Sequence, residues 1–371
     1  MRAPGSSLPH LTHRPEHEWT NSRRTSMASL RSIFLFSVRL FFVTAVSSPI
    51  AAQRQTETEI VFVHAPDGGA PWPVEDIYIM DAESRNVKSL TNDGHSHNPA
   101  WSPDGKRLLF VHDSELHSGK PSREEKQFES HHPVELYVMD RDGGNRHLLR
   151  RMEPVIYSAA WSPDGKTLAV SAVIEAAANR RQSPDEPVHA GLFLLPADAQ
   201  GEPRLLFQDA LTPAWSPDGT KLAFSLERPR GQWAVHVANS DGSDDVRLTE
   251  PPLLAGSPAW SPDGKLLAYD QFIGSRDQGI FVMEADGSHK RQIATGSNRS
   301  CDHPSWSSDG KQLVFSCHSV SVPCGMGVSS VGTRLPECER RIFGISPFEP
   351  NAKPIQLSDR DGAGPEFGPA R

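Results

Sequence analysis

The chain has 371 residues, of which 38 are Lys or Arg and 46 are Asp or Glu, so its formal net charge is -8. Residues 1–52 contain six Arg and two Glu, which leaves 32 basic against 44 acidic side chains, a net charge of -12, for the rest. This acidic balance excludes the basic face that a nucleic-acid partner normally requires. Hydrophobic residues make up 37% of the chain, which suffices for a core built from short, half-exposed strands.

The first predicted element is a targeting segment. Residues 33–46 form a strongly apolar run, which arginines precede and which small residues follow up to Ala52. This order predicts a signal peptide over residues 1–52 and therefore export to the periplasm or the medium. A membrane anchor is the alternative, but the run is short for a span and Arg39 interrupts it. Met27 is an alternative start of translation, and no later segment is apolar over a length that would span a bilayer.

The next feature is a repeat. Five segments of 13 residues align without gaps: NPAWSPDGKRLLF ending at Phe110, SAAWSPDGKTLAV at Val170, TPAWSPDGTKLAF at Phe224, SPAWSPDGKLLAY at Tyr269 and HPSWSSDGKQLVF at Phe315. Their shared positions are Trp101, Asp104 and Gly105; Trp161, Asp164 and Gly165; Trp215, Asp218 and Gly219; Trp260, Asp263 and Gly264; and Trp306, Asp309 and Gly310. Unequal spacing around a constant core indicates one structural unit that carries insertions of different size.

Each segment has the chemistry of a β-hairpin. Pro presets the second position of a turn, Asp tolerates the third and Gly supplies the left-handed residue that closes it. The alternation that follows, for example Leu108 and Phe110, has a period of two and predicts a strand with one buried face.

A second strand-turn-strand unit follows each hairpin, at 136–149, 192–207, 235–249 and 280–294, with a longer version at 341–358. Every repeat therefore holds four short antiparallel strands. Such units in tandem are the blades of a propeller, because each sheet buries its faces against its neighbours around an axis.

The two ends of the chain set the number of blades. Residues 59–64 and 77–91 read as a second, third and fourth strand with no PAWSPDG before them. The missing first strand is GPEFGPAR at 364–371, in which Phe367 takes the Trp position. We therefore predict an all-β fold, a six-bladed propeller over residues 53–371 that closes by pairing its last strand with its first blade.

The repeat resembles a known family. PAWSPDG followed by a strand of the form IFVMEADG (280–287) is similar to the repeat of TolB-like propellers over residues 58–371. The resemblance implies the fold, and three functional settings: the Tol-Pal envelope system, the non-catalytic domain of prolyl-oligopeptidase-like peptidases, and sugar lyases. TolB carries an α/β domain before its propeller where this chain has the predicted signal segment, so a Tol-Pal role does not follow. No G-x-S-x-G nucleophile elbow occurs in the sequence.

The repeated aspartates have a structural and a catalytic interpretation. A catalytic residue is usually unique, whereas a turn residue recurs with its turn, so we interpret the SPDG residues as structural. The segments at 140–144, 239–245 and 284–288 have some of the acidic residues of a calcium loop but lack the full pattern with its distal Glu. We expect tight turns there and no cofactor, with calcium as the alternative.

Histidines suggest a metal site as a further alternative. His97 precedes the second blade's tryptophan, and Asp302 and His303 precede that of the sixth, so His97 and His303 are expected to face a common space at the channel mouth. A channel-lining histidine is more common than a metal ligand. We expect no metal, with these three residues as the candidates, and His131 and His132 stand in an insertion nearby.

The insertions indicate where a partner binds. All the long ones, at 112–133, 172–190 and 317–340, follow the second strand of a blade and so share one face. Variable loops on a rigid scaffold usually carry function. We favour a monomeric, exported scaffold that binds a protein or cell-envelope ligand on this face. The alternative is an enzyme sited in the channel, such as a polysaccharide lyase or hydrolase, which converging His and acidic residues would favour.

The four cysteines all lie in the sixth repeat, at Cys301, Cys317, Cys324 and Cys338. An even count in an exported protein predicts two disulfides. We predict Cys301–Cys317 and Cys324–Cys338; the alternative pairing is Cys317–Cys338 with Cys301–Cys324, and a zinc site is a further rival.

The first pairing depends on the register of the hairpin. If Trp306 and Lys311 flank the SSDG turn, Cys301 lies opposite Ser316 and one residue from Cys317. The Cα atoms of the two cysteines are then expected about 5–7 Å apart, within reach of a disulfide.

Overall fold

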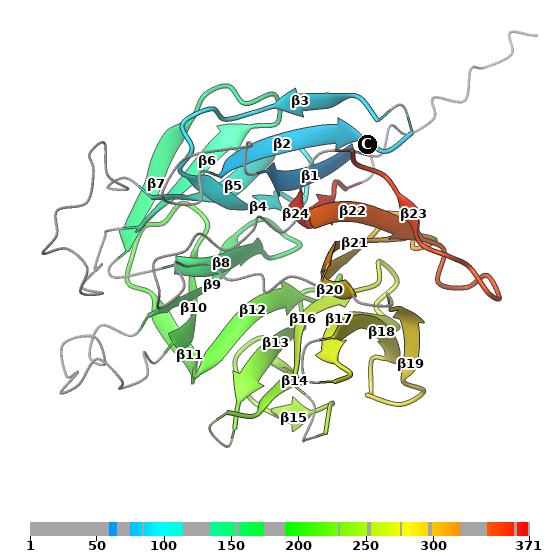
Figure 1. Ribbon diagram of the computed structural model, residues 1–371. Coiled ribbons are helices and arrows are strands. Elements are labelled where there is room, and N and C mark those ends of the chain that lie inside the picture. Colours follow the sequence, from blue (N-terminus) through cyan, green and yellow to red (C-terminus); the bar gives the residue numbers. More distant parts are fainter. Residues whose placement is uncertain are drawn as a thin grey trace, which may run out of the picture. The chain divides into compact units, whose positions relative to one another are not determined.

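The protein is described by a computed structural model that covers residues 59–64, 75–83, 85–113, 134–152, 156–173, 190–228, 231–250, 254–274, 277–295, 299–319, 340–359 and 362–369 (Figure 1). The chain divides into two compact units, residues 1–53 and 54–371, and every described residue lies in the second. The predicted signal peptide, most of each long insertion, His131, His132, Cys324 and Cys338 lie outside the described residues.

The described residues form six antiparallel sheets of four strands each. Blades 1 to 3 contain β24 (Ala363–Phe367), β1 (Glu59–His64), β2 (Asp76–Asp81) and β3 (Val87–Ser89); β4 (Ser96–Trp101), β5 (Arg107–Asp113), β6 (Val134–Asp140) and β7 (His147–Met152); and β8 (Ile156–Trp161), β9 (Thr167–Val173), β10 (Ala190–Pro196) and β11 (Arg204–Gln208).

Blades 4 to 6 contain β12 (Ala210–Trp215), β13 (Lys221–Glu227), β14 (Trp233–Asn239) and β15 (Val246–Arg247); β16 (Ala255–Trp260), β17 (Leu266–Phe272), β18 (Gln278–Glu284) and β19 (Arg291–Ala294); and β20 (Arg299–Trp306), β21 (Leu313–Ser319), β22 (Arg340–Ile345) and β23 (Ile355–Gln356). Figure 1 shows the sheets arranged around an axis, with β24, β4, β8, β12, β16 and β20 innermost. The predicted six-bladed propeller is confirmed. Among the described residues there is no helix of the length and apolar character needed to cross a bilayer.

The last strand closes the ring as predicted. β24 pairs antiparallel with β1, and Phe367 lies opposite Ile60. Phe367 is buried at the seam between blades 6 and 1, against Ile60, Phe62, Val314 and Ile342. Burying such a side chain contributes about 1.5–3 kcal/mol, so the closing strand is held by packing as well as by its ladder.

The hydrophobic core is divided among the seams between blades. Each of the six seams contains one cluster of buried apolar side chains from the two adjacent blades. The aromatic residue of each innermost strand packs against the preceding blade, and the indole nitrogens of Trp260 and Trp306 donate to the carbonyls of Ala214 and Ala259 at 3.2 Å. The repeated tryptophan is therefore a residue of the seams.

One face of the propeller consists of the repeated turns, and we call it the turn face. In the second blade, Ser102 donates to Asp104, whose carboxylate also accepts from the backbone of Lys106. The same contacts recur in blades 3 to 6. Hydrogen bonding by the serine hydroxyl holds the pKa of each aspartate below its usual range.

The turns also contact one another across the seams. Gly165 has a positive φ of 69°, and a Cβ built on it would meet Pro103 of the preceding blade at 3.4 Å. The same Gly-to-Pro contact recurs around the ring, and Pro369 supplies the proline that faces Gly105. The C-terminal segment thus reproduces the WSP geometry for blade 1.

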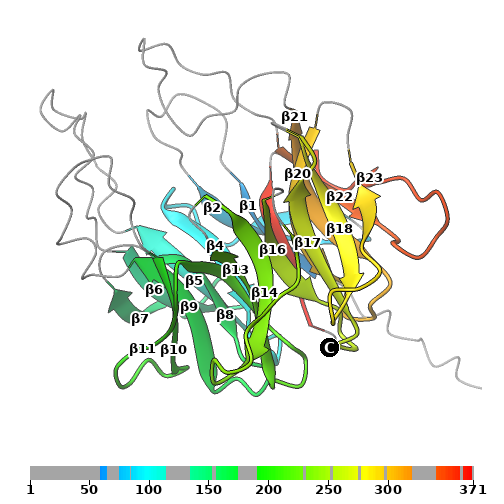
Figure 2. The ribbon, with the colours of Figure 1, turned by 90° about the horizontal axis from the view of Figure 1, so that it is seen from below.

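The opposite face carries the insertions, and we call it the insertion face. The innermost strands begin where the second strands end: Ser96 lies opposite His112, and Arg299 opposite Ser319. In Figure 2 the strands run between the two faces, with tight turns along the lower edge. We call the half of the innermost strands that lies toward the insertion face, up to and including the register shift described below, the channel mouth.

Candidate functional site

A β-bulge shapes every innermost strand at the channel mouth. The pairing of each innermost strand with its neighbour shifts by one residue near its middle. In five blades the extra residue has a positive φ and stands directly before a proline; these residues are Asn98, Thr212, Ser257, His303 and Gly364. A positive φ is strained for residues other than glycine, and a bulge re-aims the side chain that it carries. The strain therefore falls where the strands face the axis.

In blades 3 and 4 the bulge is held by a pair of hydroxyl groups. Ser158 and Ser171 lie 2.7 Å apart, and Thr212 and Ser225 lie 2.6 Å apart, in each case joining the innermost strand to the second strand. In blade 5 the partner of Ser257 is the carboxylate of Asp270. In blades 3 to 5 a hydroxyl group of the innermost strand thus bonds to a polar side chain of the second strand.

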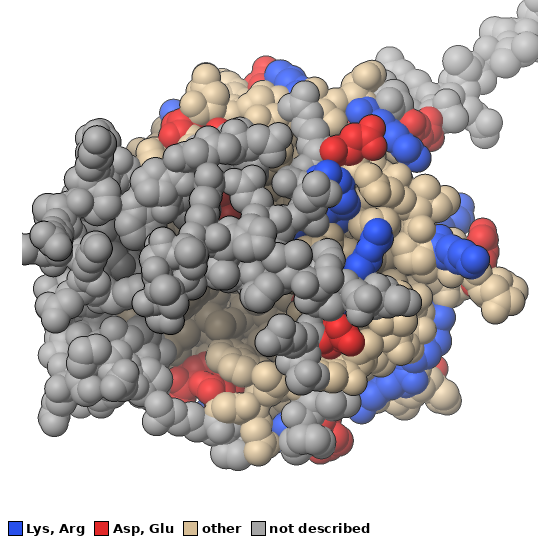
Figure 3. Space-filling view, viewed as in Figure 1, with Lys and Arg blue, Asp and Glu red and all other residues tan. Residues whose placement is uncertain are grey.

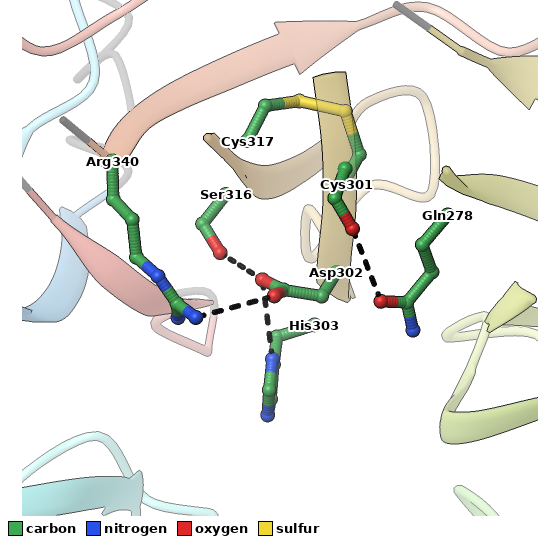
Figure 4. Close-up of a disulfide and its surroundings, with 8 residues drawn as sticks. Gln278, Cys301, Asp302, His303, Ser316, Cys317 and Arg340 are labelled. Carbon is green, nitrogen blue, oxygen red and sulfur yellow. Dashed lines mark hydrogen bonds and ion pairs between the residues drawn. A yellow bond between two sulfur atoms is a disulfide. The ribbon is translucent and has the colours of Figure 1, made fainter. Parts of the chain in front are cut away.

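Blade 6 departs from this form. His303 takes the position of the bulge residue, and the hydroxyl of Ser316 donates to Asp302 instead (Figure 4). The Nδ1 atom of His303 lies 3.3 Å from Oδ1 of Asp302, and Nη2 of Arg340 lies 3.8 Å from Oδ2. Three strands of one blade thus direct a histidine, an arginine and a serine toward a single carboxylate.

A second carboxylate approaches the same histidine from blade 5. Oδ2 of Asp270 accepts the backbone N–H of His303 at 3.2 Å, and Oδ1 accepts the side-chain amide of Gln278 at 2.8 Å. Asp270 and Asp302 are 3% and 7% exposed, whereas the side chain of His303 is 52% exposed. One buried carboxylate therefore holds the backbone of His303, and the other contacts its exposed imidazole.

The protonation states follow from these contacts. Burial raises the pKa of Asp270, and the charge of His303 only partly offsets it. Burial also opposes ionisation of Asp302, but its hydrogen bond from His303, the charges of His303 and Arg340 and the hydroxyl of Ser316 together hold its pKa well below the usual range. Burial would lower the pKa of His303, yet pairing with Asp302 and the charge of Asp270 raise it. Pairing with Asp302 therefore favours the protonated form of His303 and the ionised form of Asp302.

A disulfide stands beside this cluster, as predicted. Cys301 and Cys317 are bonded, and they lie next to Asp302 and Ser316 on the two paired strands. The predicted register was wrong: Cys301 lies directly opposite Cys317, with a Cα–Cα distance of 4.1 Å instead of about 5–7 Å. The turn holds six residues between Trp306 and Leu313, and the bulge after Asp302 then shifts the pairing by one residue.

His97 is in a different environment from His303. It aligns with Asp302, one position before the bulge, and burial together with the neighbouring His112 lowers its pKa to about 4. The structure therefore places the two predicted histidines at different positions of the repeat. Among the described residues, no three His, Cys, Asp or Glu side chains are arranged to hold a metal ion.

Charged side chains of both signs lie on the described part of the surface. Figure 3 views the propeller as in Figure 1, and positive and negative side chains alternate on the part of this view that is not covered in grey. A cavity of about 610 Å³ lies elsewhere, between the turns of blades 4 and 5, where Asp218, Asp263 and Asp286 line it. These three carboxylates already accept hydrogen bonds from their own turns. The buried carboxylate that is paired with cationic side chains, Asp302, lies at the channel mouth and not in this cavity.

Comparison with known proteins supports the assignment of the fold. A model of the TolB beta propeller domain matches residues 206–333. The crystal structure of TolB from Acinetobacter baumannii aligns with a TM-score of 0.61 at 16% identity, covering 85% of this chain and 67% of that one. The described residues share the β-propeller fold of TolB, and residues 206–333 match the model of its propeller domain.

Two curated relatives match at the sequence level. The Tol-Pal system protein TolB of Anaeromyxobacter dehalogenans is 29% identical over 120 residues, which cover 32% of this chain and 25% of that protein. An uncharacterized peptidase of Bacillus subtilis, YuxL, is 26% identical over 220 residues, or 54% of this chain and 28% of that protein. This TolB-like propeller thus spans about a quarter of the length of these relatives.

The segments considered for calcium form tight turns in the propeller. Asp140 donates its backbone N–H to the carbonyl of Gly144 at 2.8 Å, and Asp142 accepts from the backbone of Gly144. Asn239 and Glu284 begin equivalent turns. The carboxylate of Asp142 therefore already accepts a hydrogen bond from its own turn.

Two functional candidates were missed from the sequence. Asp270 follows Tyr269 at a position where blades 3, 4 and 6 have serine, and this substitution was the available signal. Glu366 stands where the other innermost strands have alanine or serine, and burial raises its pKa to about 8. Blade 2 has Val111 at the position of Asp270, so Glu366 is the clearer departure from a nearly uniform position.

Proposed function

We propose that this TolB-like propeller is an exported binding scaffold that holds a protein or cell-envelope ligand at the channel mouth on its insertion face. The observation that carries the proposal is the replacement of a hydroxyl pair in blade 6 by Asp302, His303 and Arg340. Hydroxyl pairs hold the same bulge in blades 3 and 4, so the charges are not needed for the fold. Burying a charge is costly unless it is paired, and such groups concentrate at functional sites.

The geometry suggests how a ligand is recognised. Asp302 orients the ring of His303 and Asp270 holds its backbone, and the exposed ring can meet a ligand that enters along the axis. The disulfide fixes the strand positions next to Asp302 and Ser316. A rigid donor with little freedom to lose gives more affinity than a flexible surface side chain.

The experiment compares two double variants in a pull-down from envelope extract. His303→Ala with Arg340→Ala removes the two cationic partners of Asp302, and Lys265→Ala with Lys311→Ala, both exposed on the turn face, is the matched control. We expect one retained partner that is lost with the first variant and kept with the second. A partner that both variants retain, or that the control loses, would contradict the proposal.

An enzyme sited in the channel is the second candidate, and one observation favours it. Converging His and acidic side chains are present at the channel mouth, as an acid–base site requires, and the Asp302 partner orients Nδ1 of His303. The peptidase relative matches over only 28% of its own length, so its activity does not transfer. Release of new reducing ends from envelope polysaccharide by the purified protein, abolished by His303→Ala, would favour this candidate over a scaffold.

A further inference from the structure

The closing strand differs from the other innermost strands at one position. The residue before the inner aromatic is Ala100, Ala160, Ala214, Ala259 or Ser305 in blades 2 to 6. In β24 it is Glu366, which pairs with Val61 on β1 and is half-buried. A carboxyl group thus occupies a site that the repeat fills with a methyl or hydroxymethyl group.

Polar side chains join β24 to the blades on both of its sides. Oε1 of Glu366 accepts the backbone N–H of Trp101 in blade 2 at 3.4 Å. On the other side, the hydroxyl of Ser305 in blade 6 accepts the backbone N–H of Phe367 at 3.2 Å. Alanine provides no such acceptor at the seams that follow blades 2 to 5. The side-chain bonds therefore occur where the closing strand, which enters from the other end of the chain, meets its neighbours.

The surroundings of Glu366 disfavour its charged form. Burial raises its pKa to about 8, and the hydrogen bond from Trp101 only partly offsets this effect. The titratable groups on the strands packed around β24 are Glu59 and His64 on β1, His97 on β4, Arg299, Asp302 and His303 on β20, His318 on β21, and Arg340 and Arg341 on β22. Within the described residues, none of them forms an ion pair with Glu366 or contributes to its shift.

We propose that the neutral carboxyl of Glu366 locks the closing strand to blade 2, and that its ionisation loosens this seam. A carboxylate at a half-buried seam without a cation costs free energy. The stabilising contribution is complete below pH 4.5, the ordinary pKa of a glutamate, because the carboxyl is then neutral in the folded and unfolded states. It is lost as the pH rises toward the folded value of about 8. The propeller is thus closed most tightly in mildly acidic solution.

The test is the melting temperature of the full propeller at pH 5 and pH 8.5 for the wild type, Glu366→Gln and Glu202→Gln. Glutamine keeps the shape and stays neutral, and Glu202 is a matched control because its side chain is 96% exposed. We expect Glu366→Gln to match the wild type within a degree at pH 5 and to exceed it by about 3 °C or more at pH 8.5. The control is expected to follow the wild type at both values.

A second variant separates a lock from a buried charge with no role in closure. Glu366→Ala restores the residue of the repeat and removes the bond to Trp101, so it should melt below the wild type at pH 5 and above it at pH 8.5. Amide exchange at Trp101, with Trp161 as the internal reference, should be faster in Glu366→Ala than in the wild type at pH 5. Equal pH dependence in the wild type and Glu366→Gln, or unchanged exchange at Trp101, would overturn the proposal.

Discussion

The turn face and the channel mouth are built from the same strands, yet they follow opposite rules. At the turn face, blades 2 to 6 repeat one set of contacts, in which a serine, an aspartate and a backbone N–H close each turn. At the mouth the bulge recurs but its side chains change from blade to blade, from hydroxyl pairs to Asp302 and His303. Uniform contacts maintain the fold of a repeat protein, and the exceptions indicate where selection acted on something else.

The largest effect should come from breaking the ring that supports both faces. Deleting residues 363–371 removes β24, and with it the burial of Phe367 and the contact of Pro369 with Gly105. Truncating one buried aromatic residue already costs about 3–5 kcal/mol, so we expect the free energy of unfolding to fall by at least about 4 kcal/mol. Guanidinium unfolding followed by tryptophan fluorescence measures it. A truncated chain that unfolds at the same midpoint as the full chain would disprove closure by β24.

The next effect concerns the mouth alone. Cys301→Ser with Cys317→Ser opens a loop defined by a sequence separation of 16, which in the chain-entropy model costs about 3 kcal/mol. Because Asp302 and Ser316 are adjacent to the disulfide, we also expect weaker partner binding in the pull-down, while the turn face is unaffected. Full binding by the double variant would show that the disulfide stabilises the blade without positioning the site. Peptide mapping of the non-reduced protein checks the pairing, including that of Cys324 and Cys338.

The smallest effect sharpens the comparison between one serine from each face. Ser261 is buried in a turn, donates to Asp263 and accepts the backbone N–H of Leu266 at 2.9 Å. Ser261→Ala leaves that N–H unpaired and should cost about 1–3 kcal/mol. Ser300 at the mouth is equally buried but makes one bond of 3.4 Å, to Gln278, so Ser300→Ala should cost less. Thermal unfolding measures the loss of stability in each variant. A larger loss for Ser300→Ala than for Ser261→Ala would contradict the structural role of the turn face.

The fold could be predicted from the sequence because the same turn motif recurs in blades 2 to 6. PAWSPDG marks the strand, the turn and the aromatic residue of the seam at once, and GPEFGP was recognisable as its sixth, altered copy. The register near Cys301 was not predictable in the same way. A bulge adds one residue, and the sequence marks it only by the proline that follows. The sequence also does not show that the turn holds six residues and is longer than SSDG.

The candidate site was predicted in part, for a related reason. Residue type pointed to His97, Asp302 and His303. The environments of the two histidines differ because His303 is the bulge residue, whereas His97 stands one position before it. The contact of Asp270 with His303 depends on how blade 5 packs against blade 6, which the sequence does not show. For Glu366 a signal was present in the sequence, because the other five repeats have alanine or serine at its position.

The pairing of β24 with β1 has a mechanical consequence. The strands are antiparallel, and Phe367, the last residue of β24, lies opposite Ile60, the second residue of β1. A force that pulls these two strand ends apart therefore breaks the hydrogen-bonded residue pairs one after another. It is not shared by all the pairs of the two strands at once. We therefore expect the closing ladder to open under a small force, beginning with the pair of Phe367 and Ile60 and then reaching Glu366.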